Sequence, residues 1–175
     1  MELNKNLKSL NIISATREEL YEIAAFLNNC WKTEYSKIIS PDYLDAMNTD
    51  ARYDRLLERF DKKTSNFLVM RDSDRLIGVA IFGKSCIDNY PYDGEITSVY
   101  LHHDYIGRGY GHTLFTKAET ELSAQKYTYF ILDVFSDNLR AISFYQKHGY
   151  EKVAEKSIKL GEKDYPLSVF RKKHL

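Results

Sequence analysis

Three glycines stand at alternate positions in the stretch 100–112: Gly107, Gly109 and Gly111. Because glycine has no Cβ, glycines at this spacing let the backbone turn several N–H groups toward one point. An amphipathic run, 113–125, follows directly, and the N-terminus of a helix has unpaired N–H groups and a partial positive charge. Phosphate binds well to such groups. The stretch therefore predicts a site for a pyrophosphate-bearing cofactor.

Two other phosphate-binding patterns differ from this stretch. A Walker loop ends in Gly-Lys-Ser/Thr, whereas Gly111 is followed by His112. A dinucleotide fingerprint has the spacing G-x-G-x-x-G, and the spacing here is G-x-G-x-G. Asp133 lies where the ribose-binding acid of such a site would lie, so a nicotinamide-dependent enzyme stays open as an alternative. Glycines can also simply make a short connection.

The run His102-His103-Asp104 has metal-binding residue types just before the glycines. Adjacent residues of a strand point to opposite faces, so we expect the two imidazoles to diverge. No other spacing of cysteine and histidine in the chain completes a zinc site. The sequence therefore predicts no metal site.

The elements that position the glycine stretch follow from hydrophobic periodicity and turn residues. Thr16 and Glu19 form a predicted capping box, and the helix behind it runs to about Trp31. Gly149 is expected to end the last helix. The other expected helices are 43–47, 52–60, 113–125 and 139–148, and the expected strands are 10–15, 67–70, 76–82, 95–101, 129–134, 151–159 and 165–170.

Three consecutive strands with short links, from 67 to 101, should be antiparallel neighbours. The strand 129–134 is almost entirely apolar, as expected of a strand covered on both faces. It should pair in parallel with 95–101 through a right-handed crossover. The element order predicts an α/β fold on one mixed sheet.

Composition limits the class of protein. At 175 residues we expect one domain, 1–175. The net charge is zero and no basic stripe indicates nucleic acid; no apolar run is long enough for a bilayer. The N-terminus lacks the apolar region of a signal peptide. Two cysteines, Cys30 and Cys86, do not make a disulfide framework, so we expect reduced thiols in a cytoplasmic protein. The 14 tyrosines and the terminal hairpin are compatible with a homodimer.

Two motifs carry a family resemblance. The run Gly107 to Gly111 and the segment 138–150, which reads Asn-Leu-Arg-Ala-Ile-Ser-Phe-Tyr-Gln-Lys-His-Gly-Tyr, resemble the pyrophosphate loop and a later segment of the GCN5-related N-acetyltransferases, the GNAT superfamily. The element order matches over roughly 10–171. The resemblance implies a mostly antiparallel central sheet of about seven strands with helices on both faces. One departure is Ile106, where the family usually has Arg or Gln; we expect weakened or relocated phosphate contact, with Arg108 as a substitute charge.

The resemblance implies acetyl-CoA as donor. It also implies an amine acceptor, on a small molecule or on a protein N-terminus or lysine, which attacks directly in a ternary complex. No cysteine falls at a position that suggests an acetyl-enzyme. A non-catalytic acyl-CoA-binding sensor or regulatory module is the alternative. The cofactor-binding residues implied are Tyr100, Leu101, Ile106, Gly107, Arg108, Gly109, Tyr110, Gly111, His112, Thr113, Asn138, Ala141 and Phe144.

Two residues are the catalytic candidates. Tyr145 stands where the family places its proton donor to sulfur, and a phenol with a pKa of about 10 keeps its proton at neutral pH; it could equally be a core residue. Glu95 is the candidate base, directly or through water, although it could be a solvated carboxylate at a strand end. Tyr92 and Asp93 are adjacent alternatives.

The acceptor site is expected near the end of the first helix, which often walls it in this family. The candidate acceptor-binding residues are Trp31, Glu34, Tyr35 and Tyr92. Trp31 could instead serve only the core. Its local pattern also resembles a bacterial subgroup with varied amine substrates.

Overall fold

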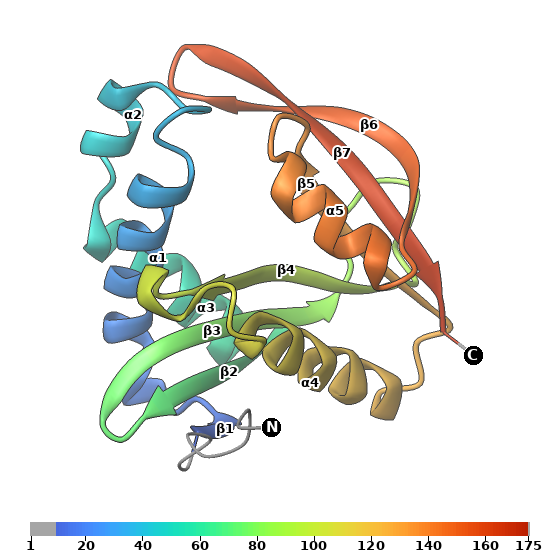
Figure 1. Cartoon of the computed structure of the whole chain (residues 1–175), viewed down its shortest axis with the longest axis horizontal. Helices are drawn as coiled ribbons and strands as arrows, with labels where there is room; N and C mark the ends of the chain where they lie inside the picture. Colours follow the sequence, from blue (N-terminus) through green and yellow to red (C-terminus); the bar gives the residue numbers. More distant parts are fainter. Residues whose placement is uncertain (1–9, 175) are drawn as a thin grey trace, which may run out of the picture.

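The computed structural model describes residues 10–174, in which seven strands form one sheet in the order β1-β2-β3-β4-β5-β7-β6 (Figure 1). The strands are β1 Leu10–Ser14, β2 Ser65–Asp72, β3 Arg75–Lys84, β4 Gly94–Leu101, β5 Tyr129–Phe135, β6 Glu151–Leu160 and β7 Lys163–Lys173. The α-helices are α1 Leu20–Glu34, α2 Pro41–Asp45, α3 Thr49–Asp61, α4 Tyr110–Ala124 and α5 Leu139–Lys147. The mixed, mostly antiparallel sheet of the prediction is confirmed.

The central pairing of the sheet also agrees with the prediction. Strands β2, β3 and β4 are antiparallel neighbours, and β4 pairs in parallel with β5. The parallel pairing is short, however, because only Gly94 with Phe130 and Glu95 with Ile131 are in register. Beyond Glu95 the two strands separate. Thr97 has no partner in the register with β3, and such a bulge bends a strand where β4 leaves β5.

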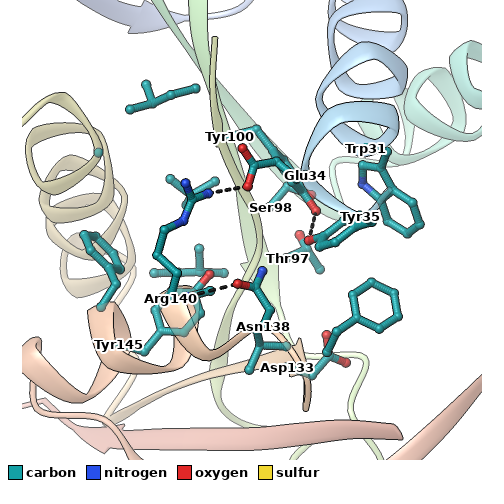
Figure 2. Close-up of a pocket in the computed structure, with 18 of the residues that line it drawn as sticks. Trp31, Glu34, Tyr35, Thr97, Ser98, Tyr100, Asp133, Asn138, Arg140 and Tyr145 are labelled. Carbon is teal, nitrogen blue, oxygen red and sulfur yellow. Dashed lines mark hydrogen bonds and ion pairs between the residues drawn. The ribbon is translucent and has the colours of Figure 1, made fainter. Parts of the chain in front are cut away.

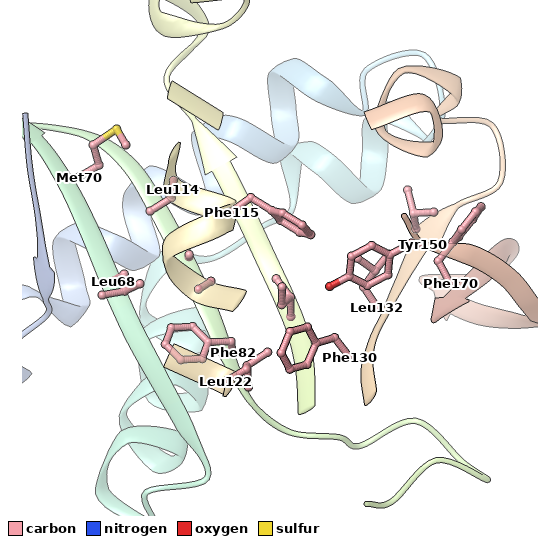
Figure 3. Packing of buried hydrophobic residues seen from close by; sticks show 14 of the residues in the cluster. Leu68, Met70, Phe82, Leu114, Phe115, Leu122, Phe130, Leu132, Tyr150 and Phe170 are labelled. Carbon is pink, nitrogen blue, oxygen red and sulfur yellow. The ribbon is translucent and has the colours of Figure 1, made fainter. Parts of the chain in front are cut away.

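Helices cover both faces of the sheet. On one face α1 and α3 pack on the alternate residues of β2 and β3 that include Phe67, Val69 and Val79. On the other face α4 packs on the intervening residues, and side chains of α5 join the same cluster (Figure 1). Figure 3 shows Phe115 and Leu122 of α4 among the side chains of this second core. The two-residue period of the strands assigns each side chain to one of the two cores.

Local signals explain where the helices begin. The Glu19 carboxylate accepts a hydrogen bond from the Thr16 N–H at 2.7 Å, which confirms the predicted capping box. Helix α3 begins earlier than predicted because the Asn48 side chain caps it, accepting from the Ala51 N–H at 2.9 Å. Helix α4 begins at Tyr110 rather than at 113, because Gly109, with φ of +87°, is already its N-cap.

Two other predictions are checked by the described residues. Cys30 is buried and Cys86 is exposed, and both are free thiols. Between residues 10 and 174 no helix combines the length and the apolar character that crossing a bilayer requires.

Candidate active site

A cavity of about 620 Å³ lies where β4 and β5 separate. Residues 96–101 of β4 form one wall, and the C-terminal end of β5 and the beginning of α5 form another (Figure 2). The end of α1, the glycine loop and part of β6 complete the lining. The separation of the two strands therefore creates the site. Six residues of the lining bear on the chemistry or the shape of the cavity but were not predicted as residues of an acetyltransferase site. They are Thr97, Ser98, Asp133, Phe135, Arg140 and Lys156.

The glycine loop lies at one end of this cavity, which Gly107, Gly109 and Gly111 line together with Ile106 and His112. A Cβ added at Gly107 or Gly109 would meet no atom within 4 Å, so the space above the loop is open. The first bond within the helix runs from the Thr113 N–H to the Gly109 carbonyl, and the N–H groups before it have no helical partner. The loop therefore has the open space and the unpaired N–H groups that a phosphate site requires.

The side chains of the other predicted loop residues lie outside the cavity lining, which omits Arg108, Tyr110 and Thr113. Arg108 is exposed, and its guanidinium carbon lies 5.9 Å from the centre of the Tyr105 ring. The charge that was expected to compensate for Ile106 is therefore engaged with an aromatic face. Tyr110 and Thr113 belong to the first turn of α4.

Two neighbouring glycines should respond oppositely to alanine. Gly109 has φ of +87°, which costs an L-residue about 1–2 kcal/mol, so Gly109→Ala should lower the melting temperature by several degrees. Gly111 has no such φ, and its added Cβ would lie 3.5 Å from Leu101, an ordinary contact. Gly111→Ala should stabilise α4 by about 0.5–1 kcal/mol. Thermal unfolding without ligand measures both, and equal shifts would contradict the assignment.

Tyr145 lines the cavity from α5. Its ring packs 5.6 Å from that of Phe115 and 5.6 Å from that of Phe144, so the core role and the site role coincide. Burial raises the pKa of Tyr145 above its ordinary value. The hydroxyl has no hydrogen-bond partner among residues 10–174, so it remains available to a ligand in the cavity.

Asn138 and Ala141 also line the cavity, at the beginning of α5. The side-chain oxygen of Asn138 accepts the Ala141 N–H at 3.1 Å, so the capping role is present. Its amide N–H₂ group remains available to a ligand. Phe144 lines the same wall.

Glu95 lies behind the cavity rather than in its lining, and it is only 5% exposed. Its carboxylate accepts the Cys86 N–H at 2.7 Å. Burial raises the pKa of Glu95, and the charge of Asp133 raises it further. The structure therefore contradicts the reading of Glu95 as a solvated strand-end carboxylate.

Asp133 is the carboxylate of β5 that reaches the cavity, where it forms an ion pair with Lys156. From its sequence position Asp133 was predicted only as a possible ribose-binding acid. The signal available in the sequence was an acidic residue within the apolar run 129–134. That run was predicted to pair in parallel with 95–101, the strand that begins with Glu95. Asp93 is excluded as a free base because Arg171 holds both of its oxygens, at 2.6 and 3.0 Å.

Trp31, Glu34 and Tyr35, three of the four residues predicted to bind the acceptor, line the cavity. The Tyr35 and Tyr100 hydroxyls lie 2.8 Å apart, and burial raises the pKa of Tyr35 to about 12. Figure 2 shows the ion pair between Glu34 of α1 and Arg140 of α5, which joins two walls of the cavity.

Tyr92 is the one predicted acceptor residue that the structure does not bring to this cavity. It is 87% exposed. It lines a separate, smaller hollow with Tyr90, Tyr129 and Arg171. The loop that carries Tyr92 lines this second hollow instead of the cavity, and we assign Tyr92 no role in acceptor binding.

The expected divergence of His102 and His103 was wrong, since their ring centres lie 4.2 Å apart. Strand β4 ends at Leu101 and a short 3-10 turn begins at His103, so the alternation of a strand does not apply. Potential ligand atoms of both rings and Asp104 lie within 4.8 Å of one another. A nitrogen of Arg75 lies 2.9 Å from His102 Nε2, so a cation already stands beside this group.

Comparisons with known proteins agree with this geometry. The model of the acetyltransferase (GNAT) family matches residues 24–150. An uncharacterized N-acetyltransferase of Bacillus subtilis, YuaI, is 28% identical over 151 residues, which cover 86% of each chain.

Solved structures share the fold. A PaiA N-acetyltransferase from Thermoplasma acidophilum in complex with coenzyme A has a TM-score of 0.74 and 23% identity over 95% of this chain and 99% of its own. YncA, a putative acetyltransferase from Salmonella typhimurium with acetyl-CoA, has a TM-score of 0.72 and 21% identity over 95% of this chain and 94% of its own. Because the family model spans well over half of the sequence and the described site has the expected glycine loop, the chain belongs to the acetyltransferase (GNAT) family.

Proposed function

We propose that the protein transfers the acetyl group of acetyl-CoA to an amine, by direct attack in a ternary complex. The observation that carries the proposal is the continuous cavity between β4 and β5. One end of it offers backbone N–H groups suited to phosphate, and the other end offers aromatic and carboxylate side chains suited to an amine. Two solved structures of similar fold hold coenzyme A or acetyl-CoA.

The residues present fit the proposed donor. The glycine loop and the first turn of α4 would hold the pyrophosphate, since they combine unpaired N–H groups with the positive end of a helix. The side of β4 that faces away from β3 has no strand partner beyond Glu95, and the backbone of Leu101 would bind the pantetheine arm there. The backbone of Tyr100 faces β3 instead, because hydrogen-bonded pairs alternate along an antiparallel ladder and His102 already bonds Ile77. When bound, acetyl-CoA supplies an activated thioester.

The chain's own groups then divide the remaining work. Trp31 and Tyr35 would hold the acceptor by packing. Glu34 and Asp133, which are paired with Arg140 and Lys156, would contribute carboxylate oxygens to hold a cationic amine. Glu95 is the proposed base, reached through water, because it lies behind the lining and has a raised pKa. Tyr145 would donate its proton to the departing sulfur. The two proton transfers are thus assigned to groups from different strands and helices.

A thermal-shift experiment tests donor binding. Acetyl-CoA at a hundredfold excess over its Kd should stabilise the folded protein by about 2.7 kcal/mol, which raises the melting temperature by several degrees. NAD is the matched control ligand, because it also carries a pyrophosphate. A shift with NAD and none with acetyl-CoA or CoA would contradict the proposal in favour of the nicotinamide alternative.

A second measurement separates an enzyme from a sensor. A panel of amines, from small polyamines to peptides with free N-termini, is tested for acetyl-CoA-dependent release of thiol. The proposal expects release that depends on at least one amine. Binding of acetyl-CoA without release for any amine in the panel would instead support the non-catalytic alternative.

A further inference from the structure

Two histidines that lie 36 residues apart in the sequence share a hydrogen bond at the glycine-loop end of the cavity. His112 Nδ1 and His148 Nε2 are 2.8 Å apart. His148 Nδ1 lies 2.8 Å from the carbonyl oxygen of Phe144. His112 is exposed and lines the cavity, whereas His148 is half-buried at the end of α5. The pair therefore connects the cavity lining to the backbone of α5.

The hydrogen bonds determine where the protons of a neutral pair lie. A carbonyl oxygen only accepts, so His148 Nδ1 carries a proton and its Nε2 has a lone pair. That lone pair must accept from His112, whose own proton is then on Nδ1. The Nε2 of His112 is consequently a lone pair, with no protein partner among residues 10–174. A neutral pair can offer an anion no hydrogen bond.

One additional proton changes this. If His112 takes the charge, its Nδ1–H still donates to His148 and its Nε2 gains a hydrogen. If His148 takes the charge, its Nε2–H donates to His112 Nδ1, and the proton of His112 moves to Nε2. The three hydrogens of the charged pair then lie on His148 Nδ1, between the two rings and on His112 Nε2. In either case His112 Nε2–H is present. The two rings take up this proton as a unit.

The charges near His112 are positive. His112 lies in the first turn of α4, at the positive end of the helix dipole, and the exposed side chains of Arg108 and Lys147 carry the same sign. In the described part of the chain no carboxylate lies within 4.0 Å of either ring, and Glu119 of α4 is paired with Lys172 of β7 at 2.9 Å. His148 is the C-cap of α5 and lies at the negative end of that helix.

We propose that the His112–His148 pair takes up one proton when a phosphate-bearing ligand binds at the glycine loop, and that His112 Nε2–H then holds a phosphate oxygen. This rests on the proposed binding of acetyl-CoA. The protonated pair, with one ring from α4 and one from the end of α5, thereby supplies a charged hydrogen-bond donor to the phosphate. Ile106 cannot supply such a donor. Phosphate affinity at this site is thereby linked to pH.

Isothermal titration with CoA tests the proposal, in buffers of different ionisation enthalpy at pH about 7.5. The dependence of the observed heat on the buffer gives the number of protons taken up. The wild-type protein should take up about half a proton or more beyond the His148→Gln variant. His112→Gln should show the same loss. His103→Gln, an exposed histidine of the preceding turn, is the control and should match the wild type.

Protonation changes of CoA itself are common to all variants and cancel in the comparison. The wild-type affinity for CoA should also fall at least threefold from pH 6.5 to 8.5, against a smaller change in His148→Gln. Equal uptake and equal pH dependence in folded wild type, His112→Gln and His148→Gln would overturn the inference alone. CoA that fails to bind the wild type would overturn both the inference and the proposed function.

Discussion

Tyr145→Phe should lower the turnover number on the order of ten- to a thousandfold while the melting temperature hardly changes. The substitution keeps the ring that packs on Phe115 and Phe144 and removes only the hydroxyl. A general acid contributes about 10²–10⁴-fold to a rate, and loss is smaller where water takes its place. Thiol release at saturating acetyl-CoA, with the best amine of the panel, measures the effect.

The reason for so large an effect is the state of this hydroxyl. Burial keeps the phenol protonated across the working pH range, and no protein group of the described residues accepts its hydrogen bond. Tyr35→Phe is the matched control, because the Tyr35 hydroxyl also lies in the cavity but is bonded to Tyr100. It should affect turnover less. Wild-type turnover in Tyr145→Phe would remove this residue from the proton transfer.

Glu95→Gln should reduce turnover by about a hundredfold or more and should also make the protein more stable at neutral pH. Glutamine keeps an oxygen for the Cys86 N–H but cannot accept a proton from the amine. The steady-state rate and the melting temperature of the same preparation report the two effects. Opposite signs would separate a functional role from damage to the fold.

The stability effect has a defined pH dependence. Burial raises the pKa of Glu95 in the folded protein above its unfolded value, so its contribution to stability is greatest below the unfolded pKa and is lost as pH rises through the folded pKa. At pH 7–8, above the unfolded pKa, Glu95 is therefore destabilising relative to glutamine, and replacing it should raise the melting temperature by about 2–4 °C per kcal/mol recovered. Near pH 4 the difference should disappear.

Asp133→Asn is the comparison that assigns the base. Asp133 lines the cavity and is paired with Lys156, so we expect its loss to weaken acceptor binding more than it lowers turnover. If instead Asp133→Asn abolishes turnover and Glu95→Gln retains it, then Asp133 is the base. The proposal for Glu95 would then be wrong.

Much of the fold could be predicted because its signals are local. The capping box at Thr16, the apolar run of β5 and the glycine that ends α5 each act on a few neighbouring residues. The beginnings of α3 and α4 were missed by three residues, because the side chain of Asn48 and the left-handed φ of Gly109 decide them.

The candidate site was predicted less completely. The glycine loop and Tyr145 lie in continuous motifs, and both reach the cavity. The strand separation after Glu95 could not be read from the apolar pattern, because periodicity reports which face is buried and not where two strands cease to pair. Tyr92 was predicted at the wrong place because the path of its loop depends on packing, which the local sequence does not report.

By itself the sequence determined the element types, the phosphate-binding turn and the family resemblance, because each depends on residues that are close together in the chain. Only the tertiary structure decided that Glu95 lies behind the cavity, that Asp133 enters it and that His112 meets His148. These placements join residues from different strands and helices. They depend on the register and bending of the sheet and on how the helices pack against it, which no single stretch of sequence encodes.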